Sequence, residues 1–394
     1  MNMLRDLSLQ DAKVLLRIDA NVPLSPEGEI LDETRLVASL ESIRYLLSKG
    51  AALILISHLG RPKGKKEERY SLRPVAERLS LLLGQPVPLA PDCIGPAVAE
   101  QAALLRSGEL MLLENVRFHI GEEEPEKDPS FVQKLALLGD TYVNDAFGTA
   151  HRKHSSTALL ARYFPGRAAA GFLMARELQA LSPFLSPKRP FDLILGGAKV
   201  STKAKVLKPL LDRVDHLFLG GGMVYTFLKA QGIPVGDSLV EESAFPLVKE
   251  LLLHPSLQLP VDLTIANRFV QDAEERIIDV SAGIPSGWQG MGVGPKTVEK
   301  WASLLEKASM IFWNGPLSVY EFPRFATVSE QMVHALSRMG ERVVVGGGDS
   351  VAMIQRMEMS SRFSYLSTGG GATLEFLAFG HLPGVDSLEG PSHG

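Results

Sequence analysis

The sequence predicts an α/β protein with two domains, each built on a mostly parallel sheet flanked by helices, and a helix that connects the two domains. Three observations support this fold class. The chain has 394 residues, which is more than one hydrophobic core usually supports. Short apolar runs alternate with helical patterns along its whole length. Glycine clusters or polar loops follow many of these runs directly, as at the carboxyl ends of strands in open α/β sheets.

The first half begins this alternation. Residues 34–49 repeat leucine and isoleucine at helical spacing, and Gly50 ends the expected helix. Ala51–Ile56 is continuously apolar, which is typical of a parallel strand buried on both faces. The other strands expected in this half are Val14–Ile18, Leu110–Leu113 and Thr141–Val143.

The second half repeats the pattern behind a connector. Phe172–Leu181 has helical spacing, and three X-Pro pairs follow it before residue 191. We therefore expect one domain over 1–171, an interdomain helix and hinge over 172–186, and a second domain over 187–380. The strands expected there are Phe191–Leu195, His216–Leu219, Met310–Trp313, Arg342–Val345 and Tyr365–Ser367.

Composition excludes several classes of protein. The formal net charge is −4, so a basic surface for nucleic acid is not expected and anions must be bound by local clusters. Cys93 is the only cysteine, which rules out a disulfide within the chain and fits a reducing cytosol. No apolar stretch approaches the roughly 20 residues that span a bilayer, and the first residues do not resemble a signal peptide.

Glycine clusters end four apolar runs of the second half. A strand followed by glycines and a helix start brings backbone N–H groups close to phosphate. Neither a Walker A motif nor a complete G-x-G-x-x-G fingerprint is present. This half therefore predicts a nucleotide site of another kind. The clusters are Gly196-Gly197, Gly220–Gly222, Gly346–Gly348 and Gly369–Gly371.

Charged residues beside these clusters have two interpretations each. Lys199 and Lys203 are four residues apart at an expected helix start, where they would share a face and hold a phosphate chain, or simply be solvated. Asp349 either holds Mg²⁺ on phosphates or caps the helix Ser350–Arg356. Gly369–Gly371 offers only backbone N–H groups, and a tight turn is its alternative.

Polar and basic residues occupy the corresponding positions of the first half. His58, Arg61, Arg117 and Arg152 lie in loops that follow strands or short polar motifs, and guanidinium groups bind phosphate and carboxylate bidentately. Several arginines at strand ends suit a small polyanionic metabolite.

Three residues at the start of the first half extend this set. Asp19 and Asn21 end the first strand and could accept hydrogen bonds from ligand hydroxyls, with a turn as the alternative for Asn21. Arg35 opposes its helix dipole unless an anion is bound there; a surface arginine is the alternative.

Taken together, the motifs of the chain resemble those of the phosphoglycerate kinase family, in the same order and over nearly the whole chain. The segments that carry the resemblance are Arg17–Pro23, His58–Pro62, Glu114–Phe118, Asp145–Arg152, Gly196–Lys199, Gly220–Met223, Trp313–Pro316, Gly346–Asp349 and Thr368–Ala372.

The resemblance implies two Rossmann-like domains joined by a helix hinge, with a C-terminal tail, about 381–394, that packs back on the first domain. It also implies a cytoplasmic, monomeric glycolytic kinase. It implies reversible phosphoryl transfer between 1,3-bisphosphoglycerate and ADP, giving 3-phosphoglycerate and MgATP, without nucleic-acid or membrane partners. The residues expected to bind the phosphoglycerate are Asp19, Asn21, Arg35, His58, Arg61, Arg117 and Arg152. Those expected to line the nucleotide site are Lys203, Gly220, Gly221, Gly290, Asn314, Pro316, Glu321, Gly348, Asp349 and Ser350, with Asp349 as the Mg²⁺ ligand. Those expected around the moving phosphoryl group are Arg35, Lys199, Lys203, Gly347 and Gly369.

Two positions depart from the family pattern. The family usually has N-G-P-x-G-V, and Ser318 replaces the second glycine here. The family's G-L-D-x-G-P has glycine, Gly292, in place of the aspartate. Both lie near the expected nucleotide pocket.

Overall fold

A computed structural model describes residues 1–389 and confirms the predicted fold class. The chain divides into two compact units. Unit 1 comprises Met1–Gln179 together with the segment that begins at His381, and unit 2 comprises Ala180–Gly380. Among residues 1–389, no helix is both long and apolar enough to cross a membrane.

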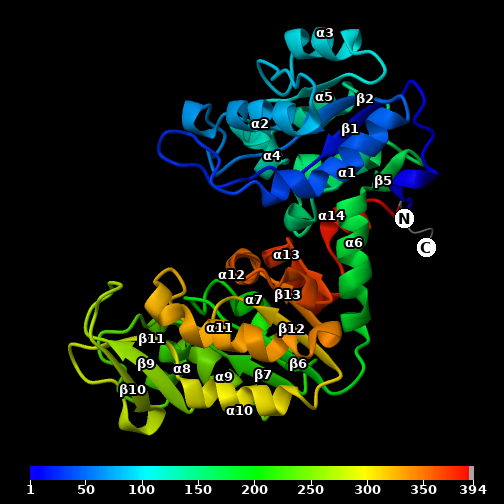
Figure 1. The fold of residues 1–394 in the computed structure, drawn as a ribbon. Helices are drawn as coiled ribbons and strands as arrows, with labels where there is room; N and C mark the ends of the chain where they lie inside the picture. Colours follow the sequence, from blue (N-terminus) through cyan, green and yellow to red (C-terminus); the bar gives the residue numbers. More distant parts are fainter. Residues whose placement is uncertain (390–394) are drawn as a thin grey trace. The chain divides into compact units, whose positions relative to one another are not determined.

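Unit 1 contains a five-stranded sheet in the order β3-β2-β1-β4-β5, and each neighbouring pair is parallel. Figure 1 labels three of its strands, β1, β2 and β5. Parallel pairing brings the carboxyl ends of all five strands to one edge. The strands are β1 (Lys13–Arg17), β2 (Ala52–Ile56), β3 (Leu110–Leu112), β4 (Thr141–Asn144) and β5 (Ala168–Ala170). The helices are α1 (Thr34–Ser48), α2 (Arg73–Leu83), α3 (Pro96–Leu104), α4 (Ile120–Glu123), α5 (Ser130–Ala136), α14 (Pro383–Asp386) and α6 (Phe172–Leu181), whose last two residues belong to unit 2.

The core of unit 1 follows from strand alternation. Val14 and Leu16 of β1 point to one face, where they pack with the apolar residues of α1 and α2. On the opposite face Tyr142 stacks on Phe164 at 6.3 Å between ring centroids. The sheet is thus buried on both sides, which explains why β2 reads as an unbroken apolar run.

The C-terminal segment groups with unit 1. Gly384 donates its backbone N–H to Ala150 O at 2.8 Å, next to the loop after β4. Residues 390–394 of the expected tail lie outside the described residues.

Unit 2 contains a six-stranded sheet in the order β14-β13-β12-β6-β7-β8, with parallel neighbours throughout. Its strands are β6 (Phe191–Leu195), β7 (His216–Leu219), β8 (Leu257–Gln258), β12 (Met310–Asn314), β13 (Val343–Gly346) and β14 (Tyr365–Leu366). Its helices are α7 (Ala204–Leu211), α8 (Met223–Ala230), α9 (Phe245–Leu251), α10 (Pro295–Leu305), α11 (Pro323–Ser337), α12 (Gly348–Arg356) and α13 (Gly371–Phe379).

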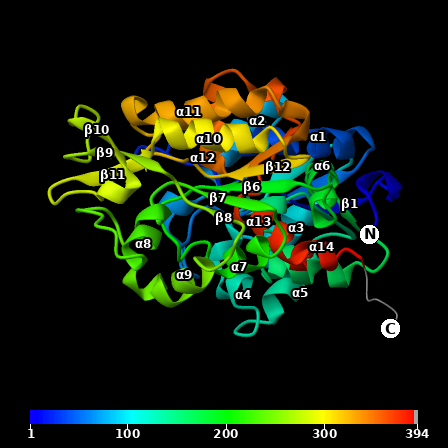
Figure 2. The same ribbon diagram turned by 90° about the horizontal axis from the view of Figure 1, so that it is seen from below.

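Helices cover both faces of this sheet. Figure 2 shows α10 and α11 on one side of β6 and β12, with α7 and α9 on the other. The core under α10 and α11 contains the buried Trp301 and Trp313. A second, antiparallel sheet in the order β10-β9-β11 was not predicted. It consists of β9 (Asp262–Ala266), β10 (Glu275–Asp279) and β11 (Gln289–Val293).

Candidate active site

In unit 1, the predicted polar residues lie in the loops that follow β1, β2 and β3. Asp19 and Asn21 follow β1, His58 and Arg61 follow β2, and Arg117 follows β3. Since the carboxyl ends of these strands share one edge, the loops meet there although they are far apart in the sequence.

The loops after β1 and β2 are tied together by hydrogen bonds. Asn21 Oδ1 accepts the Gly60 backbone N–H at 2.9 Å. Asp19 Oδ2 accepts from Arg35 Nη1 at 2.8 Å, and Asp19 Oδ1 accepts the Asn21 N–H at 3.2 Å. Arg35 stands in the first turn of α1, and its ion pair with Asp19 offsets part of the unfavourable dipole interaction. Its side chain is 38% exposed, so this cation remains open to solvent.

Arg117 is a buried cation at the same edge. Its Nη1 donates to Gly60 O at 2.7 Å, and its Nε pairs with a Glu123 carboxylate oxygen at 3.2 Å. Burial lowers the pKa of Arg117 to about 10, so the guanidinium keeps its charge at neutral pH. Asn115 fixes the backbone here by accepting the Arg117 N–H at 3.0 Å.

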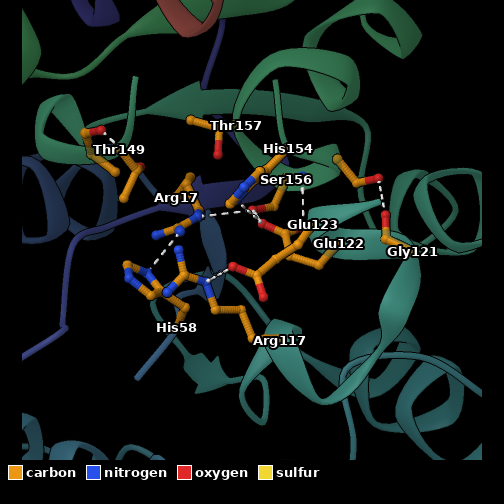
Figure 3. A network of polar contacts seen from close by, with 12 residues as sticks. Arg17, His58, Arg117, Gly121, Glu122, Glu123, Thr149, His154, Ser156 and Thr157 are labelled. Carbon is orange, nitrogen blue, oxygen red and sulfur yellow. Dashed lines mark hydrogen bonds and ion pairs between the residues drawn. The ribbon is translucent and has the colours of Figure 1, made fainter. Parts of the chain in front are cut away.

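His58 is 3% exposed and contacts Arg17, the last residue of β1 (Figure 3). Arg17 Nη2 lies 3.0 Å from His58 Nδ1. The pKa of His58 is held well below its usual range by burial and by the charges of Arg17, Arg117 and Arg35. A histidine in this setting is neutral at physiological pH.

The other two predicted arginines are placed differently. Arg61 is exposed, and Arg152 is half-buried. Within residues 1–389, neither forms a hydrogen bond or ion pair with another predicted residue. The charge of Arg152 nevertheless acts on its neighbours, because it helps to lower the pKa values of Arg117 and His154.

Sequence reasoning missed the polar residues behind this edge. Figure 3 shows them beside His58 and Arg117: the buried Arg17, Glu122, His154 and Ser156, and the half-buried Glu123. Arg17 offered the only signal, since it is a cation at the end of an apolar strand.

In unit 2, Lys203 and Asn314 form the centre of the predicted nucleotide site. Lys203 Nζ donates to Asn314 Oδ1 at 2.8 Å. Burial lowers the pKa of Lys203 to about 8, and the charge of Asp349 opposes this shift. The ammonium group is therefore largely protonated at pH 7 and sensitive to any anion placed beside it.

The glycine loops pack backbone against backbone. Gly221 has a φ of +70°, and a Cβ there would lie 2.7 Å from Gly197 N and 3.0 Å from Pro316 O. Only glycine fits such an approach. The loops after β6, β7 and β12, with Gly220 in the second of them, therefore form one surface of main-chain atoms.

The start of α12 corrects one expectation. The cap residue is Gly347, with a φ of +89°, and the helix begins at Gly348. Asp349 lies inside the first turn rather than at the cap, so its interpretation as a capping residue was wrong. Its side chain is exposed, and its Oδ1 accepts a hydrogen bond from Tyr320 Oη at 2.8 Å. Glu321, which follows Tyr320 in the sequence, is exposed as well.

Two polar atoms next to this turn are buried and unpaired. Among residues 1–389, Asn314 Nδ2 and Ser350 Oγ have no hydrogen-bond partner. Leaving buried donors unpaired costs free energy, so such atoms in a native site usually await a ligand or ordered water.

The predicted shared helix face of Lys199 and Lys203 is wrong. The helix α7 starts only at Ala204, and Lys199 lies in the exposed loop before it. Thr202 Oγ1 donates to Lys199 O at 2.7 Å and stabilises a turn in place of a helical start.

Three further glycines are also placed in ways that the sequence did not indicate. The Gly369 N–H donates to Ser367 Oγ at 3.2 Å, and Gly370 caps α13. Gly290, for which no clear strand was expected, lies inside β11 against the Tyr225 ring.

Comparison with known proteins identifies the family. The family model described as phosphoglycerate kinase matches residues 4–379. A protein named phosphoglycerate kinase from Chlamydia trachomatis serovar L2 is 49% identical over 394 residues, covering 98% of each chain. One of the same name from Chlamydia pneumoniae is 49% identical over 393 residues, covering 98% of this chain and 97% of its own.

Solved structures agree. Phosphoglycerate kinase from Coxiella burnetii has a TM-score of 0.82 and 38% identity, covering 98% of each chain. The enzyme from Pyrococcus horikoshii OT3 has a TM-score of 0.87 and 33% identity, covering 99% of this chain and 98% of its own. Sequence similarity and structural similarity to phosphoglycerate kinases thus both extend over nearly the whole chain. The chain belongs to the phosphoglycerate kinase family.

Proposed function

We propose that the protein transfers a phosphoryl group reversibly between 1,3-bisphosphoglycerate and ADP, giving 3-phosphoglycerate and MgATP as a step of glycolysis. The structural observation that supports this proposal is that the carboxyl ends of the strands carry different chemical groups in the two units. Unit 1 gathers guanidinium groups and a neutral histidine, and unit 2 gathers glycine loops around Lys203.

Unit 1 would hold the phosphoglycerate. Its phosphate and carboxylate suit bidentate arginines, and its hydroxyl suits a carboxylate or amide acceptor. Arg117 retains its charge despite burial, and Asn21 is fixed by Gly60. The proposed set is Asp19, Asn21, Arg35, His58, Arg61, Arg117 and Arg152.

Unit 2 would hold the nucleotide. The unpaired Asn314 Nδ2 and Ser350 Oγ offer donors to its oxygen atoms, and Lys203 offers a cation. The proposed lining is Lys203, Gly220, Gly221, Gly290, Asn314, Pro316, Glu321, Gly348, Asp349 and Ser350.

The carboxylate of Asp349 is suited to bind Mg²⁺. It is exposed, and Tyr320 occupies only Oδ1, which leaves Oδ2 for a cation. Protein sites commonly hold Mg²⁺ through one or two carboxylates plus substrate phosphates. Bound there, Mg²⁺ would offset charge on the nucleotide phosphates.

The chemistry needs positioned charge rather than a base. The acceptor in the ATP-consuming direction is a carboxylate with a pKa of about 4, so no proton has to be removed at pH 7. The moving phosphoryl group spreads negative charge over its oxygens, which preorganised donors and cations stabilise. We assign this task to Arg35, Lys199, Lys203 and backbone N–H groups near Gly347 and Gly369.

Water must be kept from the acyl phosphate, and the two substrates must meet. We propose that residues 172–186 act as a hinge between domains 1–171 and 187–380, with the tail from 381 belonging to the first. We further propose that the enzyme works as a cytoplasmic monomer.

A coupled assay tests the function. ATP, Mg²⁺ and 3-phosphoglycerate are supplied, and a dehydrogenase that reduces 1,3-bisphosphoglycerate reports the product by oxidation of NADH. We expect turnover that depends on each of the three additions. A protein that binds both ligands without turnover would instead be an anion sensor. Tight NADH binding in a fluorescence titration without kinase activity would favour a dehydrogenase.

A further inference from the structure

A buried chain of polar groups leads from α4 to His58 (Figure 3). Glu122 of α4 accepts the Ser156 backbone N–H at 2.9 Å and the Ser156 hydroxyl at 2.7 Å. Arg17 Nε then donates to Ser156 Oγ at 2.9 Å. Arg17 Nη2 reaches His58 Nδ1 at 3.0 Å. All four side chains are at most 3% exposed, so solvent does not compete for these contacts.

The direction of the last contact is fixed by chemistry. A guanidinium has five N–H donors and no acceptor, and it stays protonated in proteins. The Arg17–His58 contact therefore requires Nδ1 of the imidazole to be the acceptor, with a lone pair and no proton. A neutral ring with an unprotonated Nδ1 carries its proton on Nε2.

We infer that Arg17, anchored by Ser156 and Glu122, is a positioning residue that holds His58 as the neutral Nε2–H tautomer, so that His58 offers the substrate one directed N–H donor rather than a positive charge. The substrate role of His58 rests on the function proposed above. The tautomer itself does not.

The charges around His58 act in the same direction. Arg17 of β1, Arg35 of α1 and Arg117 after β3 disfavour an imidazolium at position 58, and burial disfavours it further; the ring of His154 would add to this only if it were protonated. Glu122 is the buried anion of the group. Burial raises the pKa of Glu122, while Arg17, Arg117 and the Ser156 hydrogen bonds oppose that rise.

His154 does not compete for the same role. Its Nδ1 lies 3.9 Å from Glu122 Oε1, and burial and the neighbouring arginines lower the pKa of His154 to about 3. The positive charge that attracts the substrate therefore comes from the arginines, and His58 contributes one N–H donor of fixed direction. A neutral donor adds specificity for an oxygen acceptor without adding like-charge repulsion among the arginines.

Nuclear magnetic resonance of the ¹⁵N-histidine-labelled full chain tests this directly, with His58→Gln to assign the signals. Two-bond ¹H–¹⁵N correlations distinguish the two neutral tautomers and the imidazolium. We expect His58 to show the Nε2–H pattern unchanged from pH 5.5 to 8.5. A ring that titrates in this range, or one protonated on Nδ1, would overturn the inference.

Adding 3-phosphoglycerate separates the inference from the proposed function. We expect the Nε2 resonance of His58 to shift while Nδ1 stays unprotonated. Binding that moves other unit 1 signals and leaves His58 unchanged would remove its donor role. No binding at all would contradict the proposed function and leave the tautomer result standing.

Variants test the part played by Arg17. Arg17→Met removes the donor to Nδ1, and we expect a mixed tautomer population and a KM for 3-phosphoglycerate raised about ten- to a hundredfold, the range for one charge-assisted hydrogen bond. Arg17→Lys should restore the tautomer in part, since an ammonium can also donate to Nδ1. Arg44→Met is the matched control, because Arg44 is an exposed arginine of unit 1 that donates to Leu82 O.

A wild-type His58 pattern in a folded Arg17→Met protein would show that Arg17 does not set the tautomer. If the Arg17→Met protein does not fold, the spectrum of the wild type shows which tautomer His58 adopts, and the Ser156→Ala variant tests whether the anchored Arg17 sets that tautomer. Ser156→Ala removes the hydrogen bond that anchors Arg17 while keeping Arg17 itself, and we expect intermediate tautomer populations of His58. An unchanged His58 spectrum would show that Ser156 and Glu122 do not contribute to setting the tautomer.

Discussion

Gly292 and Ser318 depart from the family motifs at positions 26 residues apart, and they touch in the structure. A Cβ built on Gly292 would lie 2.4 Å from Ser318 Cβ and 2.7 Å from Ser318 Cα. The Ser318 hydroxyl is 2.7 Å from Ser329 Oγ. A side chain at position 318 therefore excludes one at position 292. The two departures thus meet at one contact, with the glycine in β11 and the side chain in the loop after β12.

We predict that Gly292→Ala lowers the free energy of unfolding of unit 2 by about 1–3 kcal/mol, the usual cost of overpacking. In the Ser318→Gly background part of that loss should disappear, because the contact with Cβ at position 318 is removed while the close contact with the backbone Cα at 2.7 Å remains. Urea unfolding followed by tryptophan fluorescence measures it, since all three tryptophans, Trp288, Trp301 and Trp313, lie in unit 2. Equal losses in both backgrounds would show that the two positions are independent.

Arg35 is a partly exposed cation held at a helix start, and we predict that Arg35→Ala lowers kcat by roughly 10²–10³-fold, as for loss of one group that stabilises a transition state. Arg35→Lys should retain more activity because it keeps a charge. The coupled assay measures both. Arg44→Met, which alters another arginine of α1, is the control. A normal kcat in Arg35→Ala would remove Arg35 from the reacting centre.

Asp349 gives a prediction for the other substrate. Asp349→Ala should raise the KM for MgATP about tenfold or more, since it removes a charged ligand group. Tyr320→Phe removes only the hydrogen bond to Oδ1 and should have a smaller effect. Titration of ATP at fixed free Mg²⁺ measures the change. An unchanged KM in Asp349→Ala would leave this carboxylate without a nucleotide role.

At the scale of elements, Asp145 joins the sheet of unit 1 to the start of α6. Its backbone N–H donates to Arg17 O at 2.8 Å, at the end of β1. Its buried carboxylate accepts the Met174 N–H at 3.1 Å, in the first turn of α6. Burial raises the pKa of Asp145 to about 6, against an ordinary value of 3.8. The helix that ends unit 1 is thus anchored directly to a strand of the candidate site.

This raised pKa predicts a pH dependence of stability. Between about pH 4 and 6 the folded chain holds the Asp145 proton and the unfolded chain releases it, so the free energy of unfolding falls as pH rises. The full effect is about 3 kcal/mol for a shift of about two pKa units. Urea unfolding followed by far-ultraviolet circular dichroism should show this slope in the wild type and its loss in Asp145→Asn. Parallel pH profiles would contradict the assignment.

The elements also show where prediction from sequence stops. The bounds of β6, β7 and α6 were predicted as the structure has them, because each is a strong apolar pattern bounded by turn residues. The antiparallel sheet was missed. Its strand β10 is largely exposed on both faces, and β11 contains Gly290 and Gly292, so neither displays an alternating pattern.

At the scale of the whole molecule, the chain is two units of similar construction, and the boundary between them falls within α6. If the enzyme closes on its substrates, its radius of gyration should decrease when 3-phosphoglycerate and MgATP are both present, and less with either alone. Small-angle scattering measures this, and its forward intensity also tests for a monomer of 42.8 kDa. An unchanged radius with both ligands bound would contradict hinge closure.

The sequence by itself determined the fold class, most strands and which chemical groups follow them, because apolar periodicity and glycine or arginine at a strand end are local properties of the chain. Only the tertiary structure decided how those groups are oriented. The proton position on His58 depends on an arginine 41 residues away, and the space at Gly292 depends on Ser318. Such relations arise from packing between strands distant in sequence, and no local pattern encodes them.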